Sequence, residues 1–485
     1  MATFNTLGAV TVAITAVIVA VIFRRQYFHP LGKIPGPWYT NWSSIVHLVQ
    51  TLRGVGPIYV DNLHKRYGPV VRVGPNLVDV IDLETVKKIH RVKADFTKAD
   101  FYRNIPVGVE NLFNTQDLQF HRRHRKLLSA PLSESNLKAL QPQIQERIKL
   151  AIEKMGDEMK SRKAADVCKW WMFMTTDVIG QLTFGESFHM LESGQVNRYI
   201  EDLQMAGIVG TVGSSLGPAV LYIPLPFVGS LKSVQYRLSQ YAASQLKRLR
   251  EELQDESKGK QALLLSRLVQ GQTVDGESLT DKELRDDAEL YIVAGSDTTS
   301  NTLTYITWAL CKQPQLRDRL VKEVQNLPEA FSDDDLKHLP FLNDCITEGL
   351  RRFPVVPGGL QRSVPQEGSS IGGHWLPGGS TVMTQNWSLH RNPDIFPDPD
   401  TFNPSRWEHP TKLMKDSMLA FGGGSRVCIG MHLAYIELRM GLAHFFRTFP
   451  NSSVSTREGM CDDDMAQALH FISSPQHHRC LIDAA

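Results

Sequence analysis

The chain has 485 residues, of which 42% are hydrophobic, and its 53 Lys and Arg nearly balance its 51 Asp and Glu. This is the composition of a globular protein with a large core, which excludes disordered, collagen-like and coiled-coil chains. The formal charge of +2 argues against nucleic-acid binding through bulk electrostatics. The six cysteines contain no C-x-x-C pair, which argues against a disulfide scaffold or a zinc ribbon.

The N-terminal segment predicts a membrane anchor. Residues 6–23 carry no charge, and Arg24 and Arg25 follow them directly. As a helix, about 18 residues span about 27 Å, close to the hydrocarbon thickness of a bilayer. No basic residue precedes this run, as a cleavable signal peptide would require, and the basic pair after it places the rest of the chain in the cytosol. We therefore expect residues 1–23 to be an anchor, with an N-terminal core helix as the alternative.

A basic segment rich in Pro and Gly, residues 24–40, follows the expected anchor. Its prolines and glycines disfavour a regular helix or strand, so we expect a stiff hinge between the membrane and the body of the protein. The remaining residues, 41–485, show no internal repeat and no low-complexity linker. We expect them to form a single domain.

Hydrophobic periodicity in the body predicts mainly helices, with a minor β portion. Short alternating runs at 70–73 and 77–80 predict two strands separated by a Gly-Pro-Asn turn. A texture rich in Gly and Pro, typical of strands and loops, extends from 354 to about 407, and a last helix is expected at about 430–448. Apolar residues at helical spacing predict further helices near 137–160, 194–209, 231–255 and 281–313.

The segment 216–228 is apolar throughout, although it contains three prolines and a glycine that forbid a regular helix. An apolar loop between two amphipathic helices either packs under a neighbouring element or dips into the bilayer. The sequence leaves both possibilities open.

The expected helix at 281–313 contains an unusual polar cluster, Ala-Gly-Ser-Asp-Thr-Thr, at residues 294–299. Gly, Ser, Asp and Thr are poor residues for a helix interior, because their side chains compete for backbone hydrogen bonds or leave the backbone bare. Such a break of a local rule tends to mark a functional site. The hydroxyl and carboxylate groups can position water and deliver protons, whereas the alternative is a kinked packing helix.

Two further motifs contain charged residues. Glu348 and Arg351 lie three residues apart on one expected helix face, close enough for an ion pair. By itself this pattern usually indicates a solvated surface pair that contributes little. The second motif is Phe-Asn-Pro-Ser-Arg-Trp at residues 402–407, which includes Arg406.

The most informative segment is Phe-Gly-Gly-Gly-Ser-Arg-Val-Cys-Ile-Gly, residues 421–430. Its glycines let the backbone turn tightly and approach another group closely. Cys428 precedes a helix expected from about residue 429, where the helix dipole favours a thiolate, and Arg426 adds positive charge nearby. These features suit a flat anionic cofactor with a metal at its centre, and a buried structural cysteine is the alternative.

This segment resembles F-x-x-G-x-R-x-C-x-G, the haem-binding loop of the cytochrome P-450 superfamily of haem-thiolate monooxygenases. The other motifs resemble, in the same order along the chain, the A-G-x-D-T-T, E-x-x-R and F-x-P-x-R-[WF] segments of that superfamily. The resemblance implies a mainly α fold with a minor β portion, the cytochrome P-450 fold, as a single large domain behind an N-terminal transmembrane helix. The fixed positions of the loop are filled by Phe421, Gly424, Arg426, Cys428 and Gly430.

The resemblance also implies a role for each motif residue. Cys428 would be the axial ligand of the iron of haem b, and the rest of its loop would hold the haem. Thr298 would hydrogen-bond the bound oxygen, and Asp297 would supply protons. Gly295 would let the helix pass close to the haem. A buried network behind the haem, structural in its role, would consist of Glu348, Arg351 and Arg406.

Basic residues elsewhere are implied to meet the haem propionates. His121 and Arg125 match an aromatic-x-x-x-R helix segment, with His in place of the commoner Trp, and Arg362 lies where another such arginine is common. Without the resemblance, the basic run beginning at His121 would indicate a solvated face or a docking patch for a partner. The resemblance places the substrate pocket in segments 95–120, 190–230 and 465–485.

The implied reaction inserts one atom of O2 into a hydrophobic organic substrate by hydroxylation, epoxidation or a related oxidation. The chain has no intact G-x-G-x-x-G or P-loop motif, so electrons from NADPH are expected through a separate NADPH–cytochrome P-450 reductase, with cytochrome b5 as a further candidate. The chain resembles fungal microsomal members that act on polyketide or terpenoid intermediates of secondary metabolism. We expect a single-pass protein of the endoplasmic reticulum membrane with a cytosolic catalytic domain.

Two other functions remain open at this point. One is a haem-thiolate isomerase or dehydratase that does not use O2, against which the intact Asp297–Thr298 pair argues. The other is a membrane-anchored haem sensor or haem-binding protein. A requirement for both the reductase and O2 separates the monooxygenase from these two.

Overall fold

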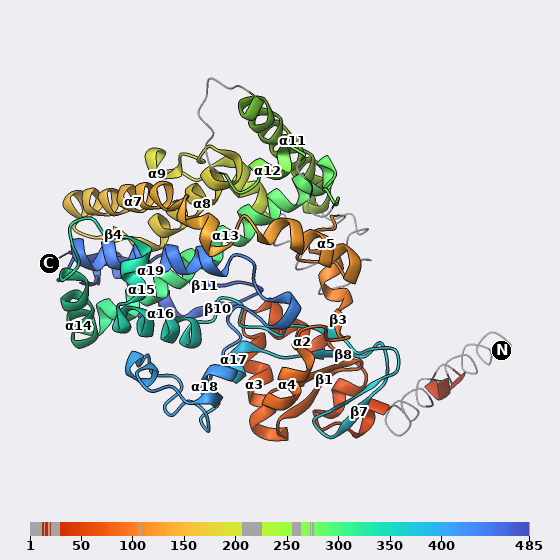
Figure 1. Ribbon diagram of the computed structural model, residues 1–485. Coiled ribbons are helices and arrows are strands. Elements are labelled where there is room, and N and C mark those ends of the chain that lie inside the picture. Colours follow the sequence, from red (N-terminus) through yellow and green to blue (C-terminus); the bar gives the residue numbers. More distant parts are fainter. Residues whose placement is uncertain are drawn as a thin grey trace, which may run out of the picture.

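The protein is mainly helical, as the sequence predicts, with the largest sheet below the long helices and a smaller one near the C-terminus (Figure 1). The two strands expected at 70–73 and 77–80 are confirmed as β1 and β2, and the long helix expected at 281–313 is confirmed as α13. The computed structural model describes residues 30–105, 109–205, 226–254, 263–271, 273 and 276–484, and a few residues between 12 and 20.

Most helices are short, and three long ones, α7, α11 and α13, cross the upper part of the molecule in Figure 1. Residues 198–205 are also helical. The helices are α2 (Ile45–Leu52), α3 (Gly56–Tyr67), α4 (Leu83–Ile89), α5 (Leu118–Ser129), α6 (Glu134–Lys138), α7 (Gln141–Arg162), α8 (Val167–Phe184), α9 (Met190–Ser193), α11 (Pro226–Gln254), α12 (Ser266–Val269), α13 (Asp281–Lys312), α14 (Pro314–Gln325), α15 (Asp333–Lys337), α16 (Pro340–Arg352), α17 (Asn386–Leu389), α18 (Lys412–Asp416) and α19 (Met431–Thr448).

In the part of the chain that the structure describes, the largest sheet has the strand order β1-β2-β8-β5-β3. Its β1 and β2 are antiparallel neighbours, whereas β2 and β8 run parallel. The strands are β1 (Val70–Gly74), β2 (Leu77–Val80), β3 (Thr97–Lys98), β4 (Ala165–Asp166), β5 (Arg362–Ser363), β6 (Ser369–Ile371), β7 (His374–Leu376), β8 (Thr381–Met383), β9 (Ser453–Val454), β10 (Gln467–Leu469), β11 (Ser473–Pro475) and β12 (Leu481–Asp483).

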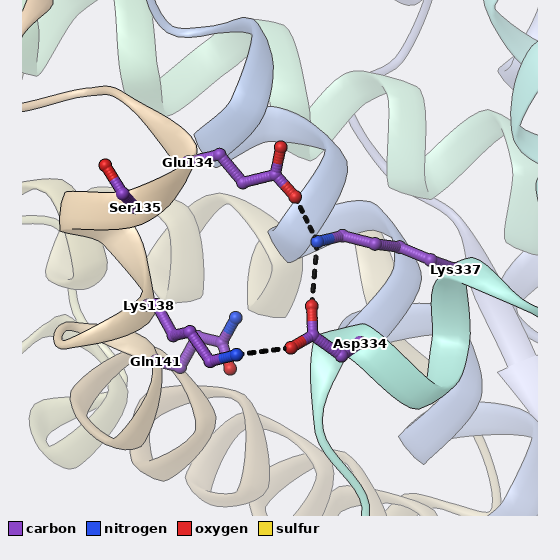
Figure 2. Close-up of a pocket in the computed structure, with 6 residues that line it drawn as sticks. All are labelled: Glu134, Ser135, Lys138, Gln141, Asp334 and Lys337. Atoms are coloured by element: carbon purple, nitrogen blue, oxygen red, sulfur yellow. Dashed lines mark hydrogen bonds and ion pairs between the residues drawn. The ribbon is translucent and has the colours of Figure 1, made fainter.

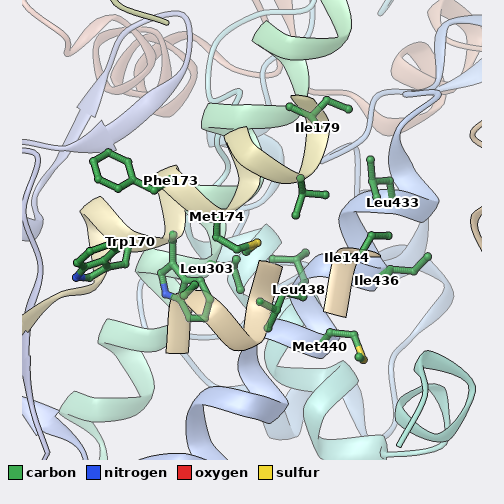
Figure 3. Close-up of a cluster of buried hydrophobic side chains, with 14 of the residues drawn as sticks. Ile144, Trp170, Phe173, Met174, Ile179, Leu303, Leu433, Ile436, Leu438 and Met440 are labelled. Carbon is green, nitrogen blue, oxygen red and sulfur yellow. The ribbon is translucent and has the colours of Figure 1, made fainter. Parts of the chain in front are cut away.

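Helix α13 runs through the centre of the main core and packs against α8 and α19. Its first turn is fixed by a capping box, in which Thr280 accepts from the Glu283 amide and the Glu283 carboxylate accepts from the Thr280 amide. Figure 3 shows the apolar side chains that fill the space between α7, α8, α13 and α19, among them Met174, Leu303 and Leu438. This core holds α13 and α19, the helices that carry or follow two of the predicted motifs.

The described part of the predicted hinge packs against the body of the protein. Leu31 and Ile34 are buried in a cluster with residues of the large sheet. The Arg72 side chain donates to the Leu31 carbonyl at 2.7 Å, and the Arg72 amide donates to the Pro35 carbonyl at 2.7 Å. Burial and these hydrogen bonds fix residues 30–40 on strand β1, within the segment that the sequence predicts to be a stiff hinge.

Most of the predicted anchor, residues 1–23, lies outside the described residues, and so do residues 216–225 of the apolar loop. Within the described ranges, we find no helix that is both long enough and apolar enough to cross a bilayer. The last three residues of the apolar loop, 226–228, belong to the first turn of α11, where the sequence predicted an irregular loop. Proline is tolerated in the first turn of a helix, because its missing N–H would have no intrahelical partner there.

Candidate active site

The loop at 421–430 is a tight turn that ends before α19. The Cys428 amide donates to the Phe421 carbonyl at 2.9 Å and closes the turn. Gly424 has a φ of +58°, and a Cβ atom there would lie 2.0 Å from the His90 carbonyl oxygen. Only glycine fits this combination of a left-handed backbone and a close approach. Gly430 is the N-cap of α19, so the helix begins two residues later than the sequence predicts.

The Cys428 side chain is exposed, although it lies in a loop between core elements. Burial nevertheless raises the pKa of its thiol, while the Gly430 amide and the charge of Arg125 act in the opposite direction. A thiol that is both accessible and surrounded by protein faces an internal space. The sequence predicted a lowered pKa from the helix dipole, but Cys428 lies outside the first turn of α19 and desolvation has the larger effect.

Four of the predicted basic residues meet beside this loop. The charge of Arg426 interacts with those of Arg362 and Arg125, and the charges of Arg426 and Arg125 also act on His121. Burial, Arg426 and Arg125 lower the pKa of His121 to about 3, so the imidazole is neutral. Arg125 donates to the Val427 carbonyl at 2.7 Å and thereby braces the residue before Cys428.

A fifth basic residue, Lys98, belongs to this cluster and was not identified from the sequence. Lys98 on β3 is paired across the sheet with Arg362 on β5. Its ammonium group is buried, and burial together with the charges of Arg362 and Arg426 holds its pKa well below the usual range. A lone lysine in a short strand carries no sequence signal, because only the pairing of β3 with β5 brings it to Arg362.

The basic cluster fits an anionic group such as the haem propionates. Both terminal nitrogens of Arg426 are buried without a hydrogen-bond partner among the described residues. Within the same ranges, no carboxylate lies at ion-pair distance from Arg125, Arg362, Arg426 or Lys98. Crowded positive charges that lack counterions are unfavourable unless an anion joins them. The residues present therefore fit a cofactor with acidic edge groups beside the Cys428 thiol.

Asp297 and Thr298 lie in the middle of α13. The Thr298 hydroxyl donates to the Ala294 carbonyl at 2.8 Å, and the neighbouring Val293 is 38% exposed in spite of its central place in the helix. This face of α13 therefore borders open space. Burial raises the pKa of Asp297 to about 6. The Asp297 charge acts on the thiol of Cys168 on α8, so the carboxyl points to a different side of α13 from Thr298.

Gly295 permits a close approach, and the structure shows this approach to be toward α8. A Cβ atom on Gly295 would lie 2.9 Å from Cγ1 of Ile179. The sequence predicted that this glycine would bring the helix close to a cofactor. The contact in the structure is helix–helix packing, which a methyl group would disturb.

The structure brings Glu348, Arg351 and Arg406 together in one buried network. The Glu348 and Arg351 side chains are both 0% exposed and form two hydrogen bonds of 2.8 Å. Arg406 reaches Glu348 at 3.1 Å, and the Trp407 indole donates to the same carboxylate at 2.9 Å. Arg351 also donates to the carbonyls of His390 and Pro399, so the network joins α16 to the segment before the Cys428 loop.

Two surface hollows contain none of the predicted catalytic residues. The first, of about 480 Å³, is polar and is closed by ion pairs of Lys337 with Glu134 and Asp334 and of Lys138 with Asp334, which Figure 2 shows. The second, of about 440 Å³, lies behind the Cys428 loop and is lined by Phe421, Val427, Met431 and Tyr435 among others. Only the second adjoins the site.

Two of the three segments expected to line a substrate pocket meet in an aromatic cluster. Phe101 and Phe113 come from segment 95–120, and Phe471 comes from segment 465–485. The ring centroids of Phe101 and Phe113 lie 6.3 Å and 6.0 Å from that of Phe471. The Lys98 ammonium lies 3.7 Å from the centroid of Phe113, which places the aromatic cluster next to the basic cluster.

The comparisons with known proteins agree with this geometry. The family model described as Cytochrome P450 matches residues 35–478. The chain belongs to the cytochrome P450 family. It is 44% identical to cytochrome P450 monooxygenase tazI of Aspergillus terreus over 98% of each chain. It is 37% identical to cytochrome P450 monooxygenase orf2 of Aspergillus niger, over 97% of this chain and 96% of that protein.

A third relative, cytochrome P450 monooxygenase stcB of Emericella nidulans, is 33% identical over 96% of this chain and 91% of its own. The activity of this P450 is therefore that of a haem-thiolate monooxygenase, with haem iron as its cofactor. Such an enzyme requires an electron donor and a hydrophobic substrate.

Proposed function

We propose that this P450 holds haem b between α13 and the Cys428 loop and inserts one atom of O2 into a hydrophobic substrate bound on the α13 side. The observation that carries this proposal is the accessible Cys428 thiol beside a cluster of basic groups without counterions. When bound through a thiolate, haem supplies the activation of O2 and the transfer of one oxygen atom.

The residues of the chain bind and orient this cofactor. The Cys428 sulfur would bind the haem iron, and the bond from Arg125 to the Val427 carbonyl fixes the backbone next to it. Arg426, whose terminal nitrogens have no other partner among the described residues, and Arg362 bind the acidic edge groups. The His121 imidazole, whose pKa is lowered to about 3, is neutral near pH 7 and donates a hydrogen bond to the same acidic groups.

Asp297 and Thr298 are the proton-moving residues of α13, with the Thr298 hydroxyl on its open side and the Asp297 carboxyl on the side toward α8. A carboxyl whose pKa is about 6 exchanges its proton readily near neutral pH, which suits a group that delivers protons repeatedly. The Thr298 hydroxyl donates to the Ala294 carbonyl, which leaves its oxygen able to accept a hydrogen bond from the open side of α13.

Electrons reach the site from a separate reductase that docks on the face behind the Cys428 loop. The hollow lined by Phe421 and Tyr435 opens on this face. Exposed basic residues also lie beside the loop: the Lys93 amide donates to Ser425 of the loop at 3.0 Å, and Arg91 lies two residues away. A basic rim favours an acidic partner and accelerates its association. NADPH–cytochrome P450 reductase and cytochrome b5 are the donors we propose.

The N-terminal apolar run anchors the protein in the membrane of the endoplasmic reticulum, with the catalytic domain in the cytosol. The length of residues 6–23 and the basic pair after them support this topology. A membrane location also suits a hydrophobic substrate and a membrane-bound reductase.

The substrate we propose is a polyketide or terpenoid intermediate of secondary metabolism. The resemblance to fungal microsomal P450s supports this class, and so does the aromatic cluster of Phe101, Phe113 and Phe471, which offers apolar contact area. Substrate-induced shifts of the haem spectrum across a panel of polyketides and terpenoids test the proposal. A panel in which only small polar compounds shift the spectrum would contradict it.

The axial ligand is tested with Cys428→Ala. The reduced, CO-bound wild-type protein should show the red-shifted Soret band of a thiolate ligand, and the variant should lose it because no other thiol can reach the iron. Cys461→Ala is the control, since Cys461 is also exposed but lies at the start of a short turn far along the chain. Survival of the band in Cys428→Ala would refute the assignment. Product formation that needs neither O2 nor the reductase would favour an isomerase or dehydratase.

A further inference from the structure

A buried carboxylate on α13, Asp287, joins three segments of the chain outside the residues described so far as catalytic. Its side chain is 0% exposed. Oδ1 accepts the Leu112 amide at 2.9 Å, and Oδ2 lies 2.5 Å from Nδ1 of His124 on α5. One carboxyl group thus binds α13 to α5 and to the loop before α5.

His124 is as deeply buried as Asp287 and has few other hydrogen-bond partners. Its side chain is 0% exposed, and the Phe120 ring stacks on it at a centroid distance of 3.7 Å. Its other nitrogen, Nε2, lies 3.4 Å from the Glu283 carboxylate, which also pairs with Arg123. Because a buried polar group that loses its partner is costly, Asp287 and His124 fix one another.

Helix α5 leads from this pair to the haem loop. His124 is flanked on the same helix by His121 and Arg125, which face the basic cluster. Arg125 makes the 2.7 Å hydrogen bond to the Val427 carbonyl, directly before Cys428. The position of α5 along α13 therefore decides where Arg125 meets the loop.

We propose that Asp287 is a positioning residue, which through its bond to His124 sets α5 so that His121 and Arg125 hold the haem and the Cys428 loop. This inference rests on the haem site of the proposed function. Asp287 touches neither substrate nor haem, and its effect passes entirely through His124 and α5. The second bond, to the Leu112 amide, ties the loop in the later part of the predicted pocket segment 95–120 to the same point.

The test uses the purified holoprotein with Asp287→Asn. The amide is the same size as the carboxylate, but it cannot accept from both His124 and Leu112. We expect the rate of haem transfer to apomyoglobin to rise about tenfold, the usual scale for losing a partner that orients a metal or cofactor ligand. A larger share of the reduced CO complex should also show the unshifted Soret band of an altered axial ligand.

A matched control separates positioning from general destabilisation. Asp464 is likewise buried, and it accepts a backbone amide, that of Cys461, at 2.8 Å and pairs with His477 at 2.8 Å. Among the residues that the structure describes, Asp464 contacts neither α5 nor the Cys428 loop. Asp464→Asn should lower the thermal midpoint by an amount similar to Asp287→Asn while leaving haem transfer at the wild-type rate.

The route through His124 is tested by two substitutions of that residue. In His124→Asn the amide nitrogen replaces Nδ1 and keeps the bond to Asp287, so haem transfer should stay within about twofold of wild type, well below the tenfold scale expected when the orienting bond is lost. His124→Ala removes the bond and should match Asp287→Asn. Equal transfer rates in the two His124 variants would overturn the route.

Equal transfer rates in Asp287→Asn and Asp464→Asn would overturn the positioning role itself. The wild-type CO spectrum separates this inference from the haem site on which it rests. Absence of the red-shifted band in the wild type would refute the Cys428 assignment, whereas the comparison of transfer rates among variants judges Asp287.

Discussion

The pKa values of single residues at this site depend more on burial than on the residues next to them in the sequence. Asp297 is the clearest case, since desolvation alone raises its pKa to about 6. The free energy of folding must then depend on pH. Because the folded pKa lies above the usual value near 4, the stabilising contribution is complete below about pH 4 and is lost as the pH rises through 6.

We therefore predict that Asp297→Asn flattens this pH dependence. Between pH 4 and pH 7 the wild-type free energy of unfolding should fall by up to about 3 kcal/mol through this group, and the variant should lack that fall. Denaturant titrations of both holoproteins at several pH values measure the difference. Parallel pH profiles for the two proteins would show that Asp297 is not the buried titrating group.

At the scale of elements, α13 is the helix on which the site depends, and it is held mainly by α8. The contact is closest at Gly295, where a Cβ atom would lie 2.9 Å from Ile179. The capping box at Thr280 fixes the beginning of the helix, and Tyr291 donates to the Leu128 carbonyl at 2.7 Å, which holds the end of α5. Helix packing therefore sets the position of α13 and, with it, the position of Thr298.

Gly295→Ala should destabilise the protein by about 1–2 kcal/mol, because overpacking against α8 outweighs the better helix propensity of Ala. Ile179→Ala in the same chain removes the obstructing atoms, so the double variant should be more stable than the sum of the single effects predicts. Unfolding free energies of the four proteins form the cycle. Strict additivity would mean that Gly295 serves another purpose than packing.

The Glu348 network is a second connection between elements, because it joins α16 to the segment that leads into the Cys428 loop. Glu348→Gln leaves Arg351 and Arg406 buried without their carboxylate, which should cost about 3–5 kcal/mol. The expected result is a large fall in the thermal midpoint and in the haem content of the purified protein.

Asp334→Asn provides the comparison for Glu348→Gln. Asp334 pairs with Lys138 and Lys337 in the polar hollow of Figure 2, where its side chain is 45% exposed. Exposed ion pairs contribute little because water and salt screen them. A fall in the midpoint as large as that of Glu348→Gln would contradict the importance we assign to burial.

At the scale of the whole molecule, the body begins to pack earlier than its sequence suggests. Leu31 and Ile34 are buried, so a soluble variant must keep them. Deleting residues 1–28 should weaken association with membranes and leave the CO spectrum intact, since the deletion stops before the buried residues. Flotation of microsomes that contain either form measures the change. Unchanged membrane association would mean that the apolar run is not the principal anchor.

The family, the helical fold and the residues of the Glu348 network could be predicted from the sequence alone, because these depend on local motifs whose spacing is fixed. Tertiary structure alone decided which basic groups meet. Lys98 joins Arg362 only through the pairing of β3 with β5. Likewise, His124 reaches Asp287 across 163 residues of chain, and Gly295 packs against Ile179 of α8. Such contacts depend on helix packing and strand pairing, which no short stretch of sequence encodes.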